Sequence, residues 1–127
     1  MPLDIHVQEN STGPGRVVTI RLVGSLDTAT APELETQVER LLDGPTTDIV
    51  FDLAQLKFIS SAGLRVFAAT RKTLTERRGQ ASFINMQPQI QEVFEIMKSL
   101  PGVAVFKSVA ELDTYLAARQ RAHTQND

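Results

Sequence analysis

Residues 47–67 read TDIVFDLAQLKFISSAGLRVF, and this stretch decides the fold. It begins with an almost continuous apolar run of strand length, which is typical of a strand covered on both faces in a parallel sheet. The letters AQLKF at 54–58 predict a short loop. Two adjacent serines, Ser60 and Ser61, then open a segment with helical spacing of apolar residues up to about Arg78. A central strand followed by a helix indicates an α/β domain.

The residues before this stretch predict an antiparallel hairpin and a helix. Apolar residues alternate with polar ones at 3–7, and a β-branched run fills 16–24, where a glycine is expected to end the strand. The turn NSTGPG at 10–15 lies between them. Thr30, with Glu33 three residues later, then predicts a capping box at the start of an amphipathic helix.

The residues after it predict two more strands and two more helices. ASFINM at 81–86 has strand character, and a helix follows in which Ile90 begins an i, i+3, i+4, i+7 apolar stripe. PGVAVF at 101–106 predicts a short last strand. Ser108 with Glu111 predicts a second capping box, opening a final helix that buries Val109, Leu112 and Leu116.

The predicted order is therefore ββαβαβαβα. This alternation indicates an α/β fold with a mixed, mostly parallel β-sheet and about four helices. We expect one domain at residues 1–120, followed by a polar, frayed C-terminal tail at 121–127.

Composition limits the possible functions. The chain has 127 residues, a formal net charge of −2, two histidines and no cysteine. This charge argues against a dedicated nucleic-acid surface, and the missing thiols exclude disulfides and thiolate metal sites. No signal peptide and no apolar run long enough to cross a bilayer is present. We therefore expect a cytoplasmic protein with no metal, no nucleic-acid partner and no membrane partner.

The serine pair lies beyond the C-terminal end of a buried strand, where open α/β sheets usually place ligand sites. Ser60 is suited to cap the helix with its side chain, and Ser61 would lie in the first turn, where the helix dipole favours a phosphate. The alternative is an ordinary cap without chemistry. Gly63 weakens a helix, and either tight packing on the sheet or close approach of a partner would offset that cost.

Serine hydrolysis is disfavoured, because neither histidine is placed to act as the base. His6 is expected on the outer face of the first strand and His123 in the tail, and ISSAG lacks the first glycine of the G-x-S-x-G elbow. No phosphate-binding glycine loop occurs. Asp27 and Asp52, expected at strand ends, would either shape the serine pocket together or serve as ordinary turn residues.

Two linked segments carry a resemblance to a known family. RLVGSLDTATAPEL, followed some thirty residues later by VFDLAQLKFISSAGLRVF, resembles the STAS domain family, in particular bacterial anti-sigma factor antagonists. In that family the start of the helix commonly reads D-S-[ST]-G-L, and the serine after the Asp is phosphorylated. That serine falls on Ser61. The Asp falls on Ser60, which becomes the alternative phosphorylation site, and the following Ser or Thr falls on Ala62.

The resemblance implies a binding protein without catalytic residues or a cofactor. Its unphosphorylated form would bind an anti-sigma factor serine kinase and release the sigma factor, and a phosphoserine phosphatase would reset it. The implied partner-binding residues are Gly24, Ser25, Leu26, Asp27, Asp52, Ser60, Ser61, Ala62, Gly63 and Leu64. One alternative is a STAS adaptor in another partner-switching pathway, such as secretion, biofilm control, chemotaxis or lipid transport. Another is a regulator that binds a small molecule or a nucleotide, or a rudimentary hydrolase.

Overall fold

The computed structural model describes residues 2–10, 16–99 and 108–125. Its elements in chain order are β1 (Leu3–Asn10), β2 (Arg16–Leu26), α1 (Ala31–Leu42), β3 (Thr46–Ile59), α2 (Ser61–Glu76), β4 (Gln80–Ile84), α3 (Pro88–Ser99) and α4 (Val109–Gln125). The predicted α/β class with about four helices is confirmed. The strand predicted at 101–106 lies outside the described residues. Residues 121–125, expected in a frayed tail, continue helix α4.

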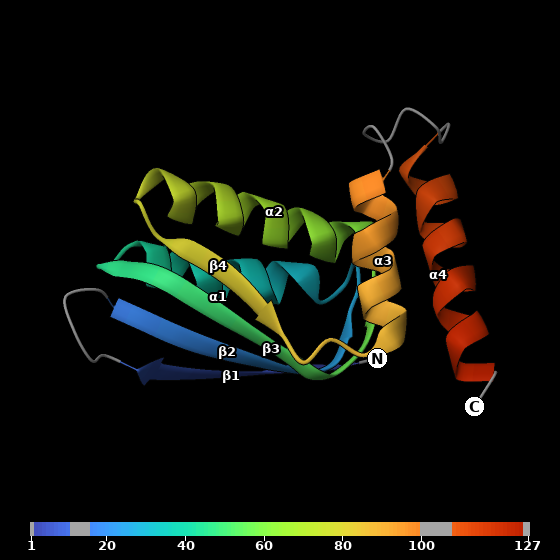
Figure 1. Ribbon diagram of the computed structural model, residues 1–127, viewed down its shortest axis with the longest axis horizontal. Coiled ribbons are helices and arrows are strands. Elements are labelled where there is room, and N and C mark those ends of the chain that lie inside the picture. The colour runs from blue at the N-terminus through green and yellow to red at the C-terminus, as the bar shows by residue number, and fades with distance from the viewer. Residues whose placement is uncertain (1, 11–15, 100–107, 126–127) are drawn as a thin grey trace.

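The sheet has the strand order β1-β2-β3-β4. The hairpin strands β1 and β2 pair antiparallel, whereas β3 runs parallel to both of its neighbours, so the predicted mixed, mostly parallel sheet is confirmed. Helices α1 and α2 lie over the sheet, and α3 and α4 stand side by side at the end where β3 leads into α2 (Figure 1). This end of the sheet holds the serine pair.

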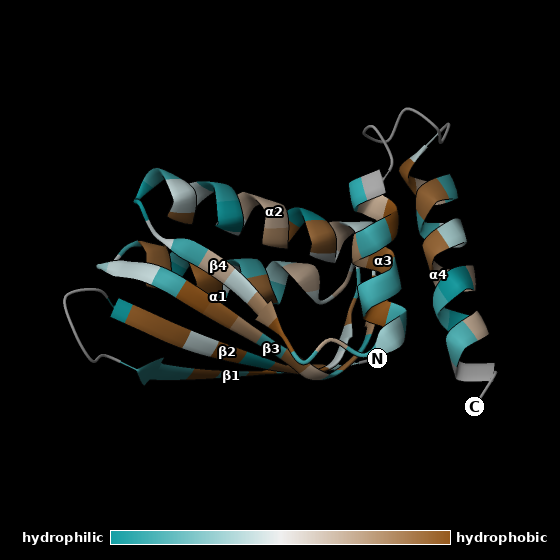
Figure 2. Ribbon diagram, in the orientation of Figure 1, coloured by the Kyte–Doolittle hydropathy of each residue, from teal (hydrophilic) through white to brown (hydrophobic). Residues whose placement is uncertain are grey.

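The core lies between the sheet and its helices. Hydrophobic residues dominate the middle of β2 and β3 (Figure 2), and Ile20, Leu22 and Phe51 are fully buried. The ring of Phe51 stacks on Phe83 with centroids 5.3 Å apart and lies 4.8 Å from Phe67 of α2. These aromatic contacts add to the free energy of burial and fix α2 against the sheet.

Strand β3 differs from its prediction in two ways. It is not covered on both faces, because buried residues such as Phe51 and Leu53 alternate with half-exposed ones such as Asp52. The loop predicted at 54–58 is also wrong, because the strand continues to Ile59. Cross-strand pairing explains the extension, since fully buried Leu56 lies opposite Gly24 of β2.

Strand β2 likewise continues past Gly24, where the sequence predicted its end. Gly24 has φ +117°, and the register with β3 shifts between Gly24 and Ser25. A Cβ atom here would lie 2.3 Å from the carbonyl oxygen of Pro2. Glycine therefore permits an irregularity within the strand rather than ending it.

Helix α1 begins where predicted, but the capping box is wrong. Thr30 is the N-cap residue by position, yet its hydroxyl donates a hydrogen bond to the carbonyl oxygen of Ser25 (2.8 Å) and forms no capping bond with a described residue. The Asp27 carboxylate instead accepts hydrogen bonds from the backbone N–H groups of Ala29 and Thr30, each at 3.0 Å. Asp27 thus holds the turn between β2 and α1.

Candidate functional site

The serine pair lies where the ends of β2 and β3 meet helix α2. Ile59, the last residue of β3, pairs with Leu26, the last residue of β2. The backbone N–H of Ser60 donates to the carbonyl oxygen of Leu26 at 2.9 Å. The structure therefore joins the two sequence segments that carry the family resemblance, although more than thirty residues separate them in the chain.

Ser60 occupies the N-cap position of α2 but does not cap it with its side chain. Its backbone is extended and its carbonyl oxygen accepts the hydrogen bond from the Leu64 N–H at 3.0 Å. The Ser60 Oγ is buried and has no hydrogen-bond partner among the described residues. The prediction of a side-chain cap at Ser60 is therefore wrong.

The cap of α2 comes from Asp113 of helix α4. Its Oδ1 accepts a hydrogen bond from the backbone N–H of Ser61 at 2.8 Å, and its Oδ2 accepts one from the Ser61 hydroxyl at 3.0 Å. A carboxylate at this position satisfies a free N–H group and interacts favourably with the positive end of the helix dipole. Ser61, in the first turn as predicted, is only 8% exposed.

 Gln120 anchors α4 on the turn that holds the serine pair, and this residue is 4% exposed. Its Oε1 accepts a hydrogen bond from the Ile59 N–H and its Nε2 donates to the Ile59 carbonyl oxygen, both at 2.8 Å. Asp113 and Gln120 therefore bind the backbone on either side of Ser60.

Sequence reasoning missed both of these α4 residues. Leu112 and Leu116 are buried, whereas Val109, which was expected to be buried with them, is 51% exposed. Asp113 and Gln120 are seven residues apart and share the buried side of the helix with these leucines. Polar residues within the apolar stripe of a helix were the signal that could have indicated a buried polar contact.

The predicted partner-binding residues divide by exposure. Five of them are buried: Ser25, Leu26, Ser60, Ser61 and Gly63. Those that are half-buried at the same end of the sheet are Gly24, Asp27, Ala62 and Leu64.

Asp52 lies apart from the other predicted site residues. It is inside β3 rather than at its end, and its carboxylate accepts hydrogen bonds from the Ala54 N–H (3.1 Å) and the Asn85 side chain (3.2 Å). These contacts tie β3 to the turn after β4. The expectation that Asp27 and Asp52 shape the serine pocket together is therefore wrong.

The structure also explains Gly63. A Cβ atom at this buried position would lie 2.6 Å from Leu26 Cγ and 3.1 Å from Ile59 Cγ1. Close packing of α2 on the ends of β2 and β3 therefore accounts for the glycine. Because glycine has no side chain, the turn at Ser60 and Ser61 can approach the sheet closely.

We expect Gly63→Ala to lower the free energy of unfolding by about 1–3 kcal/mol, because the new methyl group overpacks the core at Leu26. Helix propensity alone predicts the opposite sign, a gain of roughly 0.5–1 kcal/mol. Urea denaturation measures the difference. A stabilised variant that no longer binds its partner would instead assign Gly63 to the partner surface.

Helices α3 and α4 are joined by a charged cluster. Glu92 of α3 accepts hydrogen bonds from His123 and Arg119 of α4, the latter through Nε at 2.7 Å. The hydrogen bond from His123, followed by that from Arg119, lowers the pKa of Glu92 below its ordinary value. The carboxylate therefore stays charged and holds the C-terminal half of α4 against α3.

Neither histidine contacts the serine pair. His6 is exposed on β1, as predicted, and His123 bonds to Glu92. The group that accepts the hydrogen bond of the Ser61 hydroxyl is a carboxylate, Asp113. This arrangement lacks the serine and histidine pair of a hydrolase.

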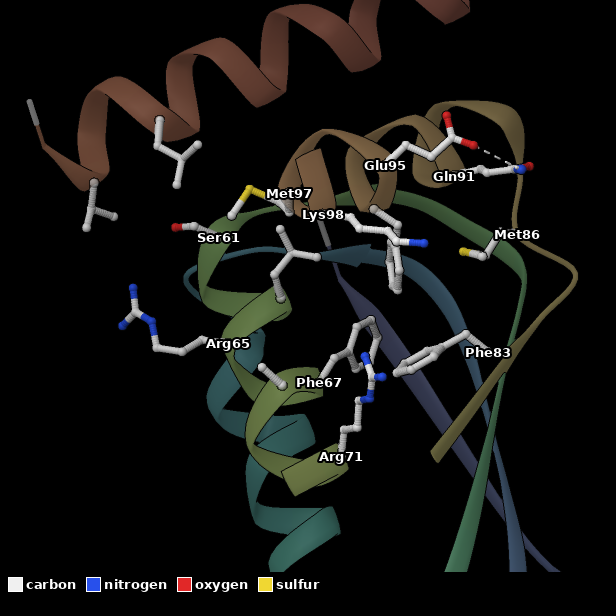
Figure 3. A pocket seen from close by; sticks show the side chains of 15 residues that line it. Ser61, Arg65, Phe67, Arg71, Phe83, Met86, Gln91, Glu95, Met97 and Lys98 are labelled. Atoms are coloured by element: carbon white, nitrogen blue, oxygen red, sulfur yellow. Dashed lines mark hydrogen bonds between the residues drawn. The ribbon is translucent and has the colours of Figure 1, made fainter. Parts of the chain in front are cut away.

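An open groove of about 960 Å³ runs beside Ser61 between α2, β4, α3 and the start of α4 (Figure 3). Apolar side chains line most of it, including Leu64, Phe83 and Met97, and Arg65 and Lys98 are among its charged residues. Ser61 lines this groove, whereas Ser60 does not belong to its lining. Of the two serines, Ser61 is thus the one beside open space.

Two further findings concern ligands and membranes. Within residues 2–10, 16–99 and 108–125, no group of three or more acidic or histidine side chains is arranged to hold a metal ion. None of the helices in this part of the chain is both long and apolar enough to cross a bilayer.

The STAS domain model matches residues 9–112, so this protein belongs to the STAS domain family. It is 37% identical over 75 residues to a Bordetella bronchiseptica protein named as an anti-sigma factor antagonist, BtrV, in a match that spans 59% of this chain and 65% of that protein. It is also 28% identical over 92 residues to the anti-sigma-B factor antagonist of Staphylococcus aureus, covering 72% of this chain and 85% of the relative.

The fold is also that of a solved anti-sigma factor antagonist. The unphosphorylated form of SpoIIAA superposes with a TM-score of 0.58 at 23% identity, over 72% of this chain and 83% of that one. The phosphorylated form of SpoIIAA, from Bacillus, gives the same TM-score of 0.58 over 72% of this chain and 82% of that one. The predicted STAS fold is therefore confirmed.

Proposed function

We propose that this protein is an anti-sigma factor antagonist whose partner binding is switched by phosphorylation of Ser61. The observation that carries the proposal is the position of the Ser61 hydroxyl, which lies in the first turn of α2 and beside the open groove. The enclosed hydroxyl of Ser60 makes that residue the weaker acceptor. Relatives named as anti-sigma factor antagonists, and a structural neighbour solved in a phosphorylated form, support the assignment.

In this proposal the unphosphorylated protein binds an anti-sigma factor that is also a serine kinase, and the bound sigma factor is released. The exposed parts of the turns at Gly24 to Asp27 and Ala62 to Leu64 form the docking surface around Ser61. The kinase supplies ATP and its metal ion, so this chain needs no cofactor and is not itself an enzyme.

Phosphoryl transfer forms a bond between the Ser61 oxygen and the γ-phosphorus of ATP. The bond from that phosphorus to the β–γ bridging oxygen breaks, ADP leaves, and the hydroxyl proton passes to a base or to solvent. The product carries a charge of about −1.5 to −2 at neutral pH. The N-terminus of α2 tolerates this charge, whereas a surface that fits a neutral serine repels it. A phosphoserine phosphatase hydrolyses the ester and resets the switch.

The test is to incubate the protein with its cognate anti-sigma factor kinase and ATP and to map the phosphate by mass spectrometry. We expect one phosphate on Ser61, its complete loss in Ser61→Ala, and its retention in Ser60→Ala. A phosphate that persists in Ser61→Ala and disappears in Ser60→Ala would move the switch to Ser60. A kinase-bound sigma factor in the captured complex distinguishes this function from that of an adaptor in another pathway.

A further inference from the structure

Helix α4 lies against the proposed phosphorylation site, where the end of β3 meets the start of α2. Asp113 binds Ser61 through both its backbone N–H and its hydroxyl, and Gln120 binds the backbone of Ile59. These contacts leave Ser61 only 8% exposed. A kinase must have free access to the hydroxyl, because the reacting oxygen has to reach the γ-phosphorus of ATP.

We propose that α4 is a latch over Ser61, which Asp113 holds closed in the unphosphorylated protein and a phosphate on Ser61 opens. This inference rests on the proposed function, since it takes Ser61 as the acceptor. It assigns Asp113 as a positioning residue that governs both access to Ser61 and the consequence of its modification.

Repulsion between negative charges explains why a phosphate on Ser61 opens the latch. The Asp113 carboxylate already occupies the place at the N-terminus of α2 where an anion is favourable, 3.0 Å from the Ser61 oxygen. A phosphate on that oxygen competes for the Ser61 N–H and brings a second negative charge next to the first. Two anions at this distance repel each other strongly, so Asp113 must leave.

The phosphate has another partner available when Asp113 leaves. Arg65 lies one turn after Ser61 on α2, and Ser61 and Arg65 extend toward the same side of the helix (Figure 3). Residues four apart on a helix are neighbours, and an arginine binds phosphate oxygens well. The loss of Asp113 therefore leaves the phosphate paired with Arg65 and the N-terminal half of α4 without its polar anchor.

Hydrogen–deuterium exchange of the full chain tests the latch without a kinase. We expect Ser61→Glu, a phosphate mimic, to accelerate amide exchange in α4 by about tenfold over the wild type. Asp113→Asn keeps the size and an acceptor oxygen but removes the charge. In the double variant Ser61→Glu with Asp113→Asn, α4 exchange should return to within about threefold of the wild type.

The matched control is Glu111→Gln, which removes the same charge from an exposed position two residues earlier on α4. It should leave the fast exchange of Ser61→Glu unchanged. The latch would be overturned if α4 exchanged equally fast in Ser61→Glu and in the double variant Ser61→Glu with Asp113→Asn. The opening would then be steric rather than electrostatic. Unchanged α4 exchange in Ser61→Glu would overturn it as well.

A second measurement addresses access. The initial rate of Ser61 phosphorylation by the cognate kinase should rise about tenfold in Asp113→Ala and stay unchanged in Glu111→Gln. Equal rates in the wild type and Asp113→Ala would contradict the gating of access. Absence of phosphorylation in every variant would instead contradict the proposed function, while the exchange experiment still decides whether α4 is a charge-sensitive latch.

Discussion

Ser61→Asp is expected to weaken binding to the cognate anti-sigma factor by roughly 30- to 100-fold, which corresponds to about 2–3 kcal/mol. Ser61→Ala should bind within about twofold of the wild type, because it keeps the site small and neutral. The aspartate places a negative charge at a contact that accommodates a hydroxyl, and burial of an unmatched charge is unfavourable. Calorimetric titration of the three proteins against the purified anti-sigma factor measures the differences.

Two sources of this loss can be separated. The new charge either repels the partner directly or drives Asp113 away and moves α4. If α4 is responsible, Asp113→Asn restores partner binding in the Ser61→Asp background, and a double-mutant cycle gives the coupling between the two positions. If repulsion by the partner is responsible, the two substitutions act independently. Equal affinity of the wild type, Ser61→Ala and Ser61→Asp would contradict the switch itself.

Periodicity was sufficient to predict most of the fold. Alternation of apolar residues located the first strand, a continuous apolar run located β3, and helical spacing with cap signals located the four helices, because each pattern depends on neighbouring residues in the chain. The ends of β2 and β3 were predicted wrongly, because they depend on pairing between segments that are distant in the chain. Gln55 and Lys57 gave residues 54–58 a polar, loop-like pattern, but pairing with β2 continues the strand. Strand boundaries depend on such tertiary contacts more than on local preference.

Local patterns likewise predicted one part of the candidate site, and a contact between distant residues determines the other. Local rules placed the serine pair at the end of β3 and the start of α2, and they assigned the cap to Ser60 because serine is a common N-cap. The cap belongs to Asp113, which lies 52 residues after Ser61 in the chain. A contact at that separation depends on how α4 packs, and no local pattern around the serines indicates it.

The sequence predicted that α2 runs to about Arg78, and the structure gives the next residue, Gly79, a packing role that periodicity did not indicate. The positive φ that commonly ends a helix occurs at Arg78 (φ 63°), and the Gly79 N–H donates to the Leu74 carbonyl oxygen at 2.7 Å. A Cβ atom at Gly79 would lie 1.6 Å from the carbonyl oxygen of Thr47. The close approach of the start of β3 therefore requires the glycine.

Gly79→Ala is accordingly expected to lower the free energy of unfolding by about 3 kcal/mol or more, the upper end for overpacking, because the obstructing atoms belong to the backbone of Thr47 and not to a flexible side chain. Gly44→Ala is the matched control at another turn, since its Cβ would meet only the Leu41 carbonyl oxygen at 3.6 Å. That variant should be neutral or more stable by about 0.4–1 kcal/mol, because alanine restricts the unfolded chain. Urea denaturation of both variants measures the contrast. Similar stabilities for the two would show that the loop before β4 moves aside freely, and that the contact with Thr47 does not fix α2 and its serine turn on the sheet.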